Sequence, residues 1–247
     1  MALKSDTFLK AFEGASRLRE FFGTLSNAFA SAESAADMQA AVERVQGTGA
    51  VVAAVDLVGD LATVSAFSKV QRTFRDELLA VTTEGLALFD PKNGVRALEA
   101  EIGNLQREAA QLVSALQSVS PELRPGFERF ALPRIQALND TLQERHTQLG
   151  DAYLELGDGK VRLIRRAVEA SQALEAELAA AVVEARRELG MPVEAEKFRQ
   201  LIAERSRDDS KALDQWLADL RRRALGDEEG DEANPPTIGQ GDPDERG

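Results

Sequence analysis

Few residues in this chain have the type and spacing that catalysis requires. The chain has one histidine, His146, and no cysteine. A single histidine excludes the paired histidine ligands of zinc enzymes and of carboxylate-bridged metal bundles, and the missing thiols exclude a cysteine nucleophile. We therefore predict that His146 lies on a solvated helix face, that the protein is not an enzyme, and that it uses no metal or cofactor.

The stretch LGDGKV at residues 156–161 is the nearest approach to a phosphate-binding loop. A Walker loop needs a glycine where Leu154 stands and a serine or threonine where Val161 stands, so the pattern fails. We interpret the two glycines as a plain turn at 157–159. Neighbouring carboxylates elsewhere are not spaced to share one helix face, so they predict neither a calcium site nor an acid–base pair.

Arginines gather in three groups in the last third of the chain, and acidic residues are interleaved with them. The groups are Arg162, Arg165 and Arg166; Arg186 and Arg187; and Arg221, Arg222 and Arg223. No aromatic side chains accompany them to stack on bases, which argues against nucleic acid as a partner. We predict solvated, salt-bridged helix faces, with a surface for phosphate-rich partners as the alternative.

The composition points to long helices. Aromatic residues make up only 5% of the 247 residues, charged residues make up 29%, and Ala, Leu, Glu, Arg and Val dominate. This usage is typical of helical bundles and coiled coils, so we predict an all-α fold. The opening residues, MALKSDTFLKAFEG, lack the pattern of a secretory signal, and we expect a cytoplasmic protein, with peripheral membrane association as the alternative.

The first residues form an amphipathic pattern. Apolar residues recur at steps of three and four, and charged residues repeat the same rhythm on the opposite side. We predict an amphipathic N-terminal helix over residues 1–26, with a bulky apolar face that continues to residue 29 and binds a partner or a membrane. The candidate residues of this face are Phe8, Phe12, Leu18, Phe22, Leu25 and Phe29.

The most regular apolar seam lies near the middle of the chain. Its spacing alternates between four and three, as in a coiled coil. The candidate seam residues are Leu98, Ile102, Leu105, Leu112, Leu116 and Val119. Such a seam predicts association of the chain with itself, as a homodimer or higher oligomer.

Two predicted turns, at 90–94 and 157–159, divide residues 27–225 into three helical arms, 27–89, 95–156 and 160–224. Prolines within the second arm are interpreted as kinks. We predict an elongated antiparallel bundle or coiled coil of three long kinked helices behind the N-terminal helix. The alternative is a compact bundle in which each break reverses the chain, giving six or seven helices.

Residues 47–67, GTGAVVAAVDLVGDLATVSAF, are long enough to span a bilayer but contain Asp56 and Asp60. Two aspartates would each cost about 2.5–3.5 kcal/mol at the centre of a membrane helix. We predict a buried core helix with both aspartates on one wet edge; the alternative is a helical pore former that releases this stretch into a membrane. The tail, residues 226–247, is rich in Pro, Gly and acid and is predicted to be disordered.

These features favour a non-enzymatic helical scaffold that self-associates and binds partners along extended helical faces. The order of elements over residues 1–224 also resembles BAR-type domains, in which an amphipathic segment precedes three long helices. This resemblance implies peripheral membrane binding or membrane remodelling. BAR-type domains present a basic surface to lipid, whereas −7 of the net charge of −12 lies in residues 227–247 and −5 in the rest. Lipid binding would therefore use the phenylalanine face of the N-terminal helix.

Overall fold

The computed structural model describes residues 2–32, 36, 40 and 54–225, and these residues are helical with short connections. No β-strand occurs in these ranges, which confirms the all-α prediction. The predicted disordered tail, residues 226–247, and residues 47–53 of the apolar stretch lie outside the described ranges. The chain divides into two compact units, one ending at Arg207 and the other beginning at Asp208.

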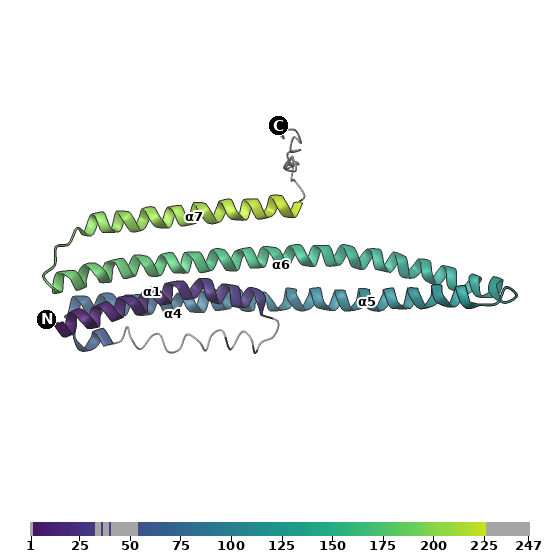
Figure 1. The fold of residues 1–247 in the computed structure, drawn as a ribbon, viewed down its shortest axis with the longest axis horizontal. Helices are drawn as coiled ribbons and strands as arrows, with labels where there is room; N and C mark the ends of the chain where they lie inside the picture. The colour runs from purple at the N-terminus through teal and green to yellow at the C-terminus, as the bar shows by residue number, and fades with distance from the viewer. Residues whose placement is uncertain (1, 33–35, 37–39, 41–53, 226–247) are drawn as a thin grey trace, which may run out of the picture. The chain divides into compact units, whose positions relative to one another are not determined.

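Five helices and one short 3-10 helix follow one another along the described chain (Figure 1). They are α1 (Ala2–Ser31), η1 (Ala54–Leu57), α4 (Leu61–Leu86), α5 (Phe89–Ser118), α6 (Arg124–Glu188) and α7 (Ala195–Leu225). The division between the two units falls within α7. In the second unit, the end of α7 buries Leu217 and leaves Trp216 about half exposed.

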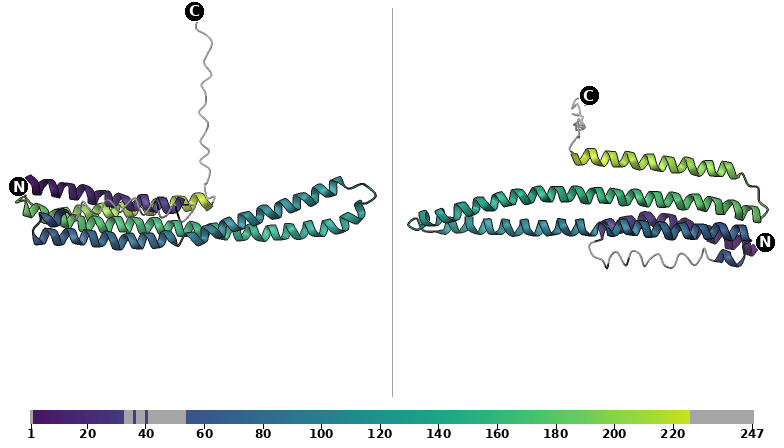
Figure 2. Two further views of the ribbon diagram at one scale, coloured as in Figure 1. Left: turned by 90° about the horizontal axis from the view of Figure 1, so that it is seen from below. Right: turned by 180° about the vertical axis from the view of Figure 1, so that it is seen from behind.

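Within the first unit, α6 is the helix on which the others pack. Helices α4 and α5 lie along different parts of α6, and α1 lies against both α4 and α6 (Figures 1 and 2). Two ion pairs show the direction of α6: Glu77 of α4 pairs with Arg166 of α6, and Glu108 of α5, later in the chain, pairs with Arg134, earlier in α6. Helix α6 therefore runs back along the direction of α4 and α5.

The turn predicted at 90–94 is wrong. Helix α4 ends at Leu86 and α5 begins at Phe89, so these residues form the first turns of α5. Pro91 is tolerated there because a helix does not use the N–H groups of its first turn in its own hydrogen bonds. The predicted boundary after residue 26 is not a helix end either, because α1 continues to Ser31.

The turn predicted at 157–159 is also wrong, because these residues lie inside the 65-residue helix α6. The chain instead reverses at 119–123, which was interpreted as part of a kinked arm. Pro121 lies in this reversal and Pro125 in the first turn of α6, while Pro133 is accommodated within the helix. Glycine suggests a turn because it allows backbone conformations that other residues avoid, but Gly159 has an ordinary helical conformation in α6.

Two glycines instead serve close helix contacts. A Cβ atom on Gly159 would lie 2.6 Å from Leu88 Cδ2, and one on Gly85 would overlap the ring of Phe29. Both positions are buried. The missing side chain at Gly85 lets α4 approach α1, and the missing side chain at Gly159 lets α6 approach Leu88.

The main core lies where α1, α4 and α6 meet, and phenylalanine dominates it. Phe12 and Phe67 have ring centroids 5.2 Å apart, and Phe22 and Phe74 have centroids 5.5 Å apart. Burying each large side chain contributes about 1.5–3 kcal/mol. The largest fully buried residues of the core are Phe8, Phe22, Phe29, Phe67, Leu18, Leu25, Leu88, Leu163, Leu174, Val55 and Val70.

The described part of the apolar stretch 47–67 is not one helix. Asp56 belongs to η1, whereas Asp60 precedes α4 and accepts a hydrogen bond from the Thr63 N–H at 2.9 Å. Asp60 is therefore a helix N-cap, and the prediction that both aspartates share one helix edge is wrong. None of the described helices is long and apolar enough to cross a membrane.

We predict that Gly85→Ala lowers the free energy of unfolding by about 1–3 kcal/mol, because the new methyl group displaces the Phe29 ring from a packed core. The matched control is Gly103→Ala on α5, where a Cβ atom meets nothing within 4 Å. The control should raise stability by up to about 1 kcal/mol through helix propensity. Denaturant unfolding of both variants measures the difference; equal effects would contradict the proposed contact.

Candidate interaction surface

His146 is exposed on α6. No group of three His, Asp or Glu side chains in the described ranges is placed to hold a metal ion. Three surfaces are candidates for binding a partner: the phenylalanine face of α1, the apolar seam of α5, and the connection between α5 and α6.

The structure places the predicted N-terminal face inside the core. Five of its six residues, Phe8, Leu18, Phe22, Leu25 and Phe29, are no more than 2% exposed. The sixth, Phe12, is half-buried and packs against Phe67 of α4. Lipid binding by this face would require α1 to separate from α4 and α6.

Glu188, the last residue of α6, joins the beginnings of α1 and α4. Its Oε1 atom accepts a hydrogen bond from Lys4 Nζ at 2.7 Å, and its Oε2 atom accepts one from the Asp60 N–H at 3.0 Å. The carboxylate is almost entirely buried. A charge that is both paired and hydrogen-bonded is favourable in such a place, and breaking it is costly.

The other end of α1 is held by Lys92 of α5. Its Nζ atom donates to the Phe29 carbonyl at 2.7 Å and to the Ala32 carbonyl at 2.8 Å. The last carbonyls of a helix have no partner within it and carry partial negative charge, so a lysine there both satisfies and stabilises them. Between the two ends, Arg19 pairs with the buried Glu175 of α6 at 3.0 Å.

Protonation of Glu188 reflects these contacts. Burial raises the pKa of its carboxyl group, but the hydrogen bonds from Lys4 and from the Asp60 N–H, together with the Lys4 charge, outweigh burial. The net result is a pKa below the ordinary value of 4.5. The carboxylate is therefore held in its charged form by the fold.

The predicted coiled-coil seam faces α6 of the same chain. Ile102 is buried, and Leu98, Leu105, Leu112, Leu116 and Val119 are half-buried. Helix α1 ends beside Lys92, so beyond that point, among the described residues of the first unit, α5 packs on α6 without α1. The seam residues of α6 are Ala131, Ile135, Leu138, Leu142, Leu149, Ala152 and Leu156.

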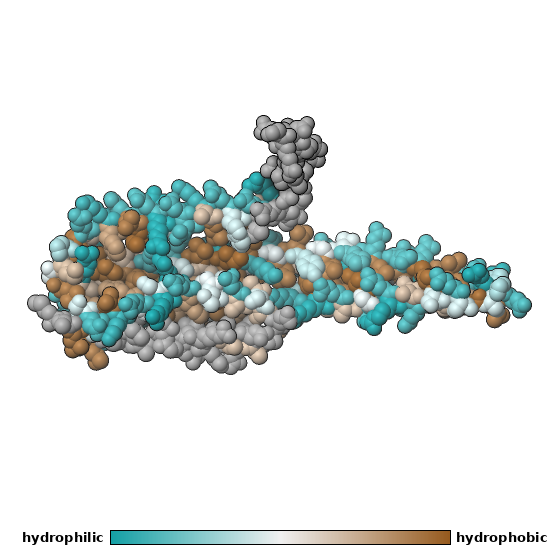
Figure 3. Space-filling view, in the orientation of Figure 1, coloured by the Kyte–Doolittle hydropathy of each residue, from teal (hydrophilic) through white to brown (hydrophobic). Residues whose placement is uncertain are grey.

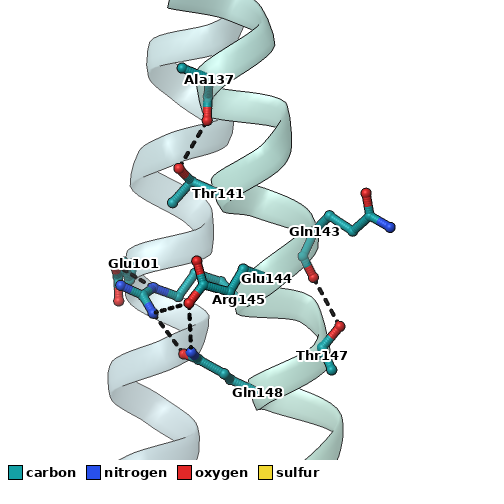
Figure 4. A network of polar contacts seen from close by, with 8 residues as sticks. All are labelled: Glu101, Ala137, Thr141, Gln143, Glu144, Arg145, Thr147 and Gln148. Atoms are coloured by element: carbon teal, nitrogen blue, oxygen red, sulfur yellow. Dashed lines mark hydrogen bonds and ion pairs between the residues drawn. The ribbon is translucent and has the colours of Figure 1, made fainter.

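Arg145 occupies a position in this seam that sequence analysis missed. The apolar spacing of α6 passes from Leu142 to Leu149, and residue 145 completes the alternation of three and four. Its guanidinium Nε donates to Glu101 at 2.8 Å and its Nη1 donates to the Gln148 side-chain oxygen at 2.7 Å (Figure 4). The gap in the apolar pattern was the available signal.

A polar residue within a coiled-coil seam selects one alignment of the helices at some cost in stability. Two further contacts across the pair match this alignment: Arg134 Nη2 lies 2.6 Å from the Glu108 carboxylate, and the Tyr153 hydroxyl donates to Glu99. The Glu108 and Glu99 contacts lie on opposite flanks of the seam. Together they fix how α5 and α6 face each other.

The connected ends of α5 and α6 expose apolar side chains, which we call the hairpin-end surface. Val113 is 41% exposed, Leu123 70%, Phe130 67% and Leu132 55%. In Figure 3, hydrophobic residues come to the surface among hydrophilic ones along α5 and α6. Sequence analysis missed this surface because the prolines at 121–133 were interpreted as a kink within one arm.

Comparisons with known proteins offer no relative to guide the choice among these surfaces: no protein-family model, no curated protein and no solved structure matches this chain.

We predict that Glu188→Gln lowers the free energy of unfolding at pH 7 by about 1–3 kcal/mol, because it removes charge-assisted hydrogen bonds. The folded pKa lies below 4.5, so the carboxylate stabilises the folded chain above that pH. This contribution should disappear as the pH falls through the folded pKa, because the carboxyl group is then protonated in both states. Denaturant unfolding at several pH values measures the convergence of the two proteins.

The matched control is Glu184→Gln, one turn earlier on α6. Glu184 pairs with Arg187 on the same helix and contacts no other helix through that pair. Surface pairs of this kind contribute about 0.5 kcal/mol or less. A Glu188 variant that costs no more than the control, or whose deficit persists at low pH, would remove the carboxylate's role in joining the three helix ends.

Proposed function

We propose that this protein is a non-catalytic helical scaffold that associates with itself through the hairpin-end surface. The observation that carries the proposal is the exposure of Val113, Leu123, Phe130 and Leu132 around one connection. Large side chains of α1, α4, α5 and α6 form the buried core of the first unit, and further exposed leucines, such as Leu3, Leu61 and Leu154, lie outside the hairpin end. The protein thus offers an apolar surface for association.

The position of this surface supports a second copy as the partner. The three-helix core ends near Val95 and Leu156, and the remaining length of α5 and α6 is a pair of helices. Two such pairs can bury their exposed side chains by packing against each other, which is how a symmetric dimer uses one surface twice. Glu122 and Arg129 are exposed and are the chain neighbours of Leu123 and Phe130, and Arg129 makes no ion pair among the described residues.

We further propose that the chain forms an elongated antiparallel bundle. Helix α6 supports this form, because its 65 residues correspond to about 100 Å when continuous. A long continuous helix cannot be accommodated in a compact globule of this size.

The shape proposal predicts a radius of gyration well above the value of about 18 Å expected for a compact chain of this length. Small-angle X-ray scattering of the full chain, at concentrations where its mass is known, measures it. A radius close to that of a compact globule would favour the compact bundle of many short helices.

The association proposal predicts that the wild-type chain is a dimer or higher oligomer and that Phe130→Glu combined with Leu132→Glu weakens association by about tenfold or more. Introducing charge into a desolvated contact removes apolar burial and adds an unpaired carboxylate. Light scattering coupled to size-exclusion chromatography, over a series of protein concentrations, measures the mass.

The control is Leu154→Glu, which adds a carboxylate at an exposed leucine of α6 far along the helix from the hairpin end. It should leave the mass unchanged. A wild-type chain that is monomeric throughout the series contradicts self-association, and equal loss in both variants contradicts the choice of surface. Far-UV circular dichroism verifies that each variant stays helical.

A further inference from the structure

The beginning of α7 and the end of α6 leave a groove between them. Two adjoining cavities of about 390 Å³ each follow the helices. The first is lined by residues within 182–186 of α6 and 192–201, and the second by residues within 172–180 of α6 and 199–206 of α7. We call them together the α6–α7 groove. Figure 3 shows hydrophobic side chains between α6 and the first part of α7. Its main apolar lining is Ala176, Ala180, Val182, Val193, Phe198 and Leu201.

The two helices are connected at both ends of the groove. At one end, Gly190 with φ of 69° turns the chain, and the Met191 N–H donates to the Arg186 carbonyl at 2.9 Å. At the other end, Gln172 Nε2 donates to the Ser206 carbonyl at 3.0 Å. Between these ties α6 presents mainly alanine and valine, which are too small to fill the space.

The wall of the groove contains a cation that has no side-chain partner among the described residues. Arg186 lines the first cavity and makes no side-chain hydrogen bond or ion pair with any described residue. The neighbouring Lys197 is already paired with Glu194 at 3.0 Å. A guanidinium group beside apolar walls suits a carboxylate, which it binds through two parallel hydrogen bonds.

The close approach of α6 and α7 at one end argues against a helix as the occupant. A helix with its side chains is about 10–12 Å across. The groove lies between two helices that a 3.0 Å hydrogen bond ties together at Gln172. A narrow, unbranched chain is the shape that fits. From Gln172 to Arg186 the groove follows α6 for roughly 20 Å at 1.5 Å per residue, a length comparable with an extended long-chain fatty acid.

We propose that the α6–α7 groove binds a single-chain anionic lipid, a long-chain fatty acid, with its carboxylate on Arg186 and its alkyl chain directed toward Gln172. Each methylene group that leaves water for the apolar lining adds to the affinity. The combined cavities lie within the size range of ligand sites in proteins, about 300–1,000 Å³. This binding is independent of the association proposed for the hairpin-end surface.

The test uses the full, delipidated chain and palmitate below its critical micelle concentration, followed by equilibrium dialysis. We expect saturable binding of one palmitate per chain. Hexadecanol, which has the same chain and no charge, should bind about tenfold or more weakly, and Arg186→Gln should weaken palmitate binding by a similar factor. Ala176→Phe, which fills the groove from an exposed position, should abolish binding of both ligands.

Two matched variants complete the test. Arg187→Gln removes the adjacent arginine, which pairs with Glu184 and does not line the groove, and should leave binding within about twofold. Ala137→Phe adds the same bulk at an exposed position elsewhere on α6 and should also leave it unchanged. Circular dichroism verifies folding of all four variants, and Arg186→Gln remains informative even if Ala176→Phe does not fold.

Absence of saturable palmitate binding would overturn the proposal, as would binding that survives both Arg186→Gln and Ala176→Phe. Equal binding of palmitate and hexadecanol would overturn the assignment of the carboxylate to Arg186. The same samples are measured by light scattering. An increase in mass on adding palmitate would place the lipid between copies of the chain and would also count against a site within the groove of one chain.

Discussion

The packing of the phenylalanine face of α1 onto α4 and α6 is the interaction on which the rest of the first unit depends. Phe8, Phe22 and Phe29 are almost completely removed from water; on α4, Phe67 stacks on Phe8 and Phe74 lies beside Phe22. Each such side chain contributes about 1.5–3 kcal/mol when buried, so the face as a whole outweighs any single polar contact. Helix α1 is therefore an integral part of the core.

The limited length of α1 divides the first unit into two kinds of structure. Alongside α1, three helices surround a core of fully buried side chains. Beyond Lys92, α5 and α6 form a two-helix pair whose seam is mostly half-buried. Hydrophobic packing has little directionality, so polar contacts are needed to select one alignment. Glu188 and Lys92 do this for α1, and Arg145 does it for the α5–α6 pair.

The same division explains why the candidate surfaces lie where they do. The hairpin-end surface occurs where, among the described residues of the first unit, only α5 and α6 cover apolar side chains. The α6–α7 groove occurs where α6 presents residues too small to fill the space beside α7. At the first, apolar side chains stay exposed, and at the second, a cavity is left between two helices. The proposed self-association uses the exposed side chains, and the proposed lipid site uses the cavity.

The sequence by itself determined the helical class, the amphipathic character of α1 and the apolar seam of α5, because these depend on side-chain periodicity along one helix. Only the tertiary structure decided where the chain reverses and what each face covers. Gly159 and the residues around Pro91 have local signals for turns, yet both lie in helices. Gly159 packs against Leu88, and Pro91 lies in the first turn of α5, where no N–H is needed. The face of α1 was equally suited to lipid or to a core. Periodicity shows that a face is apolar, whereas its partner is set by residues distant in the chain.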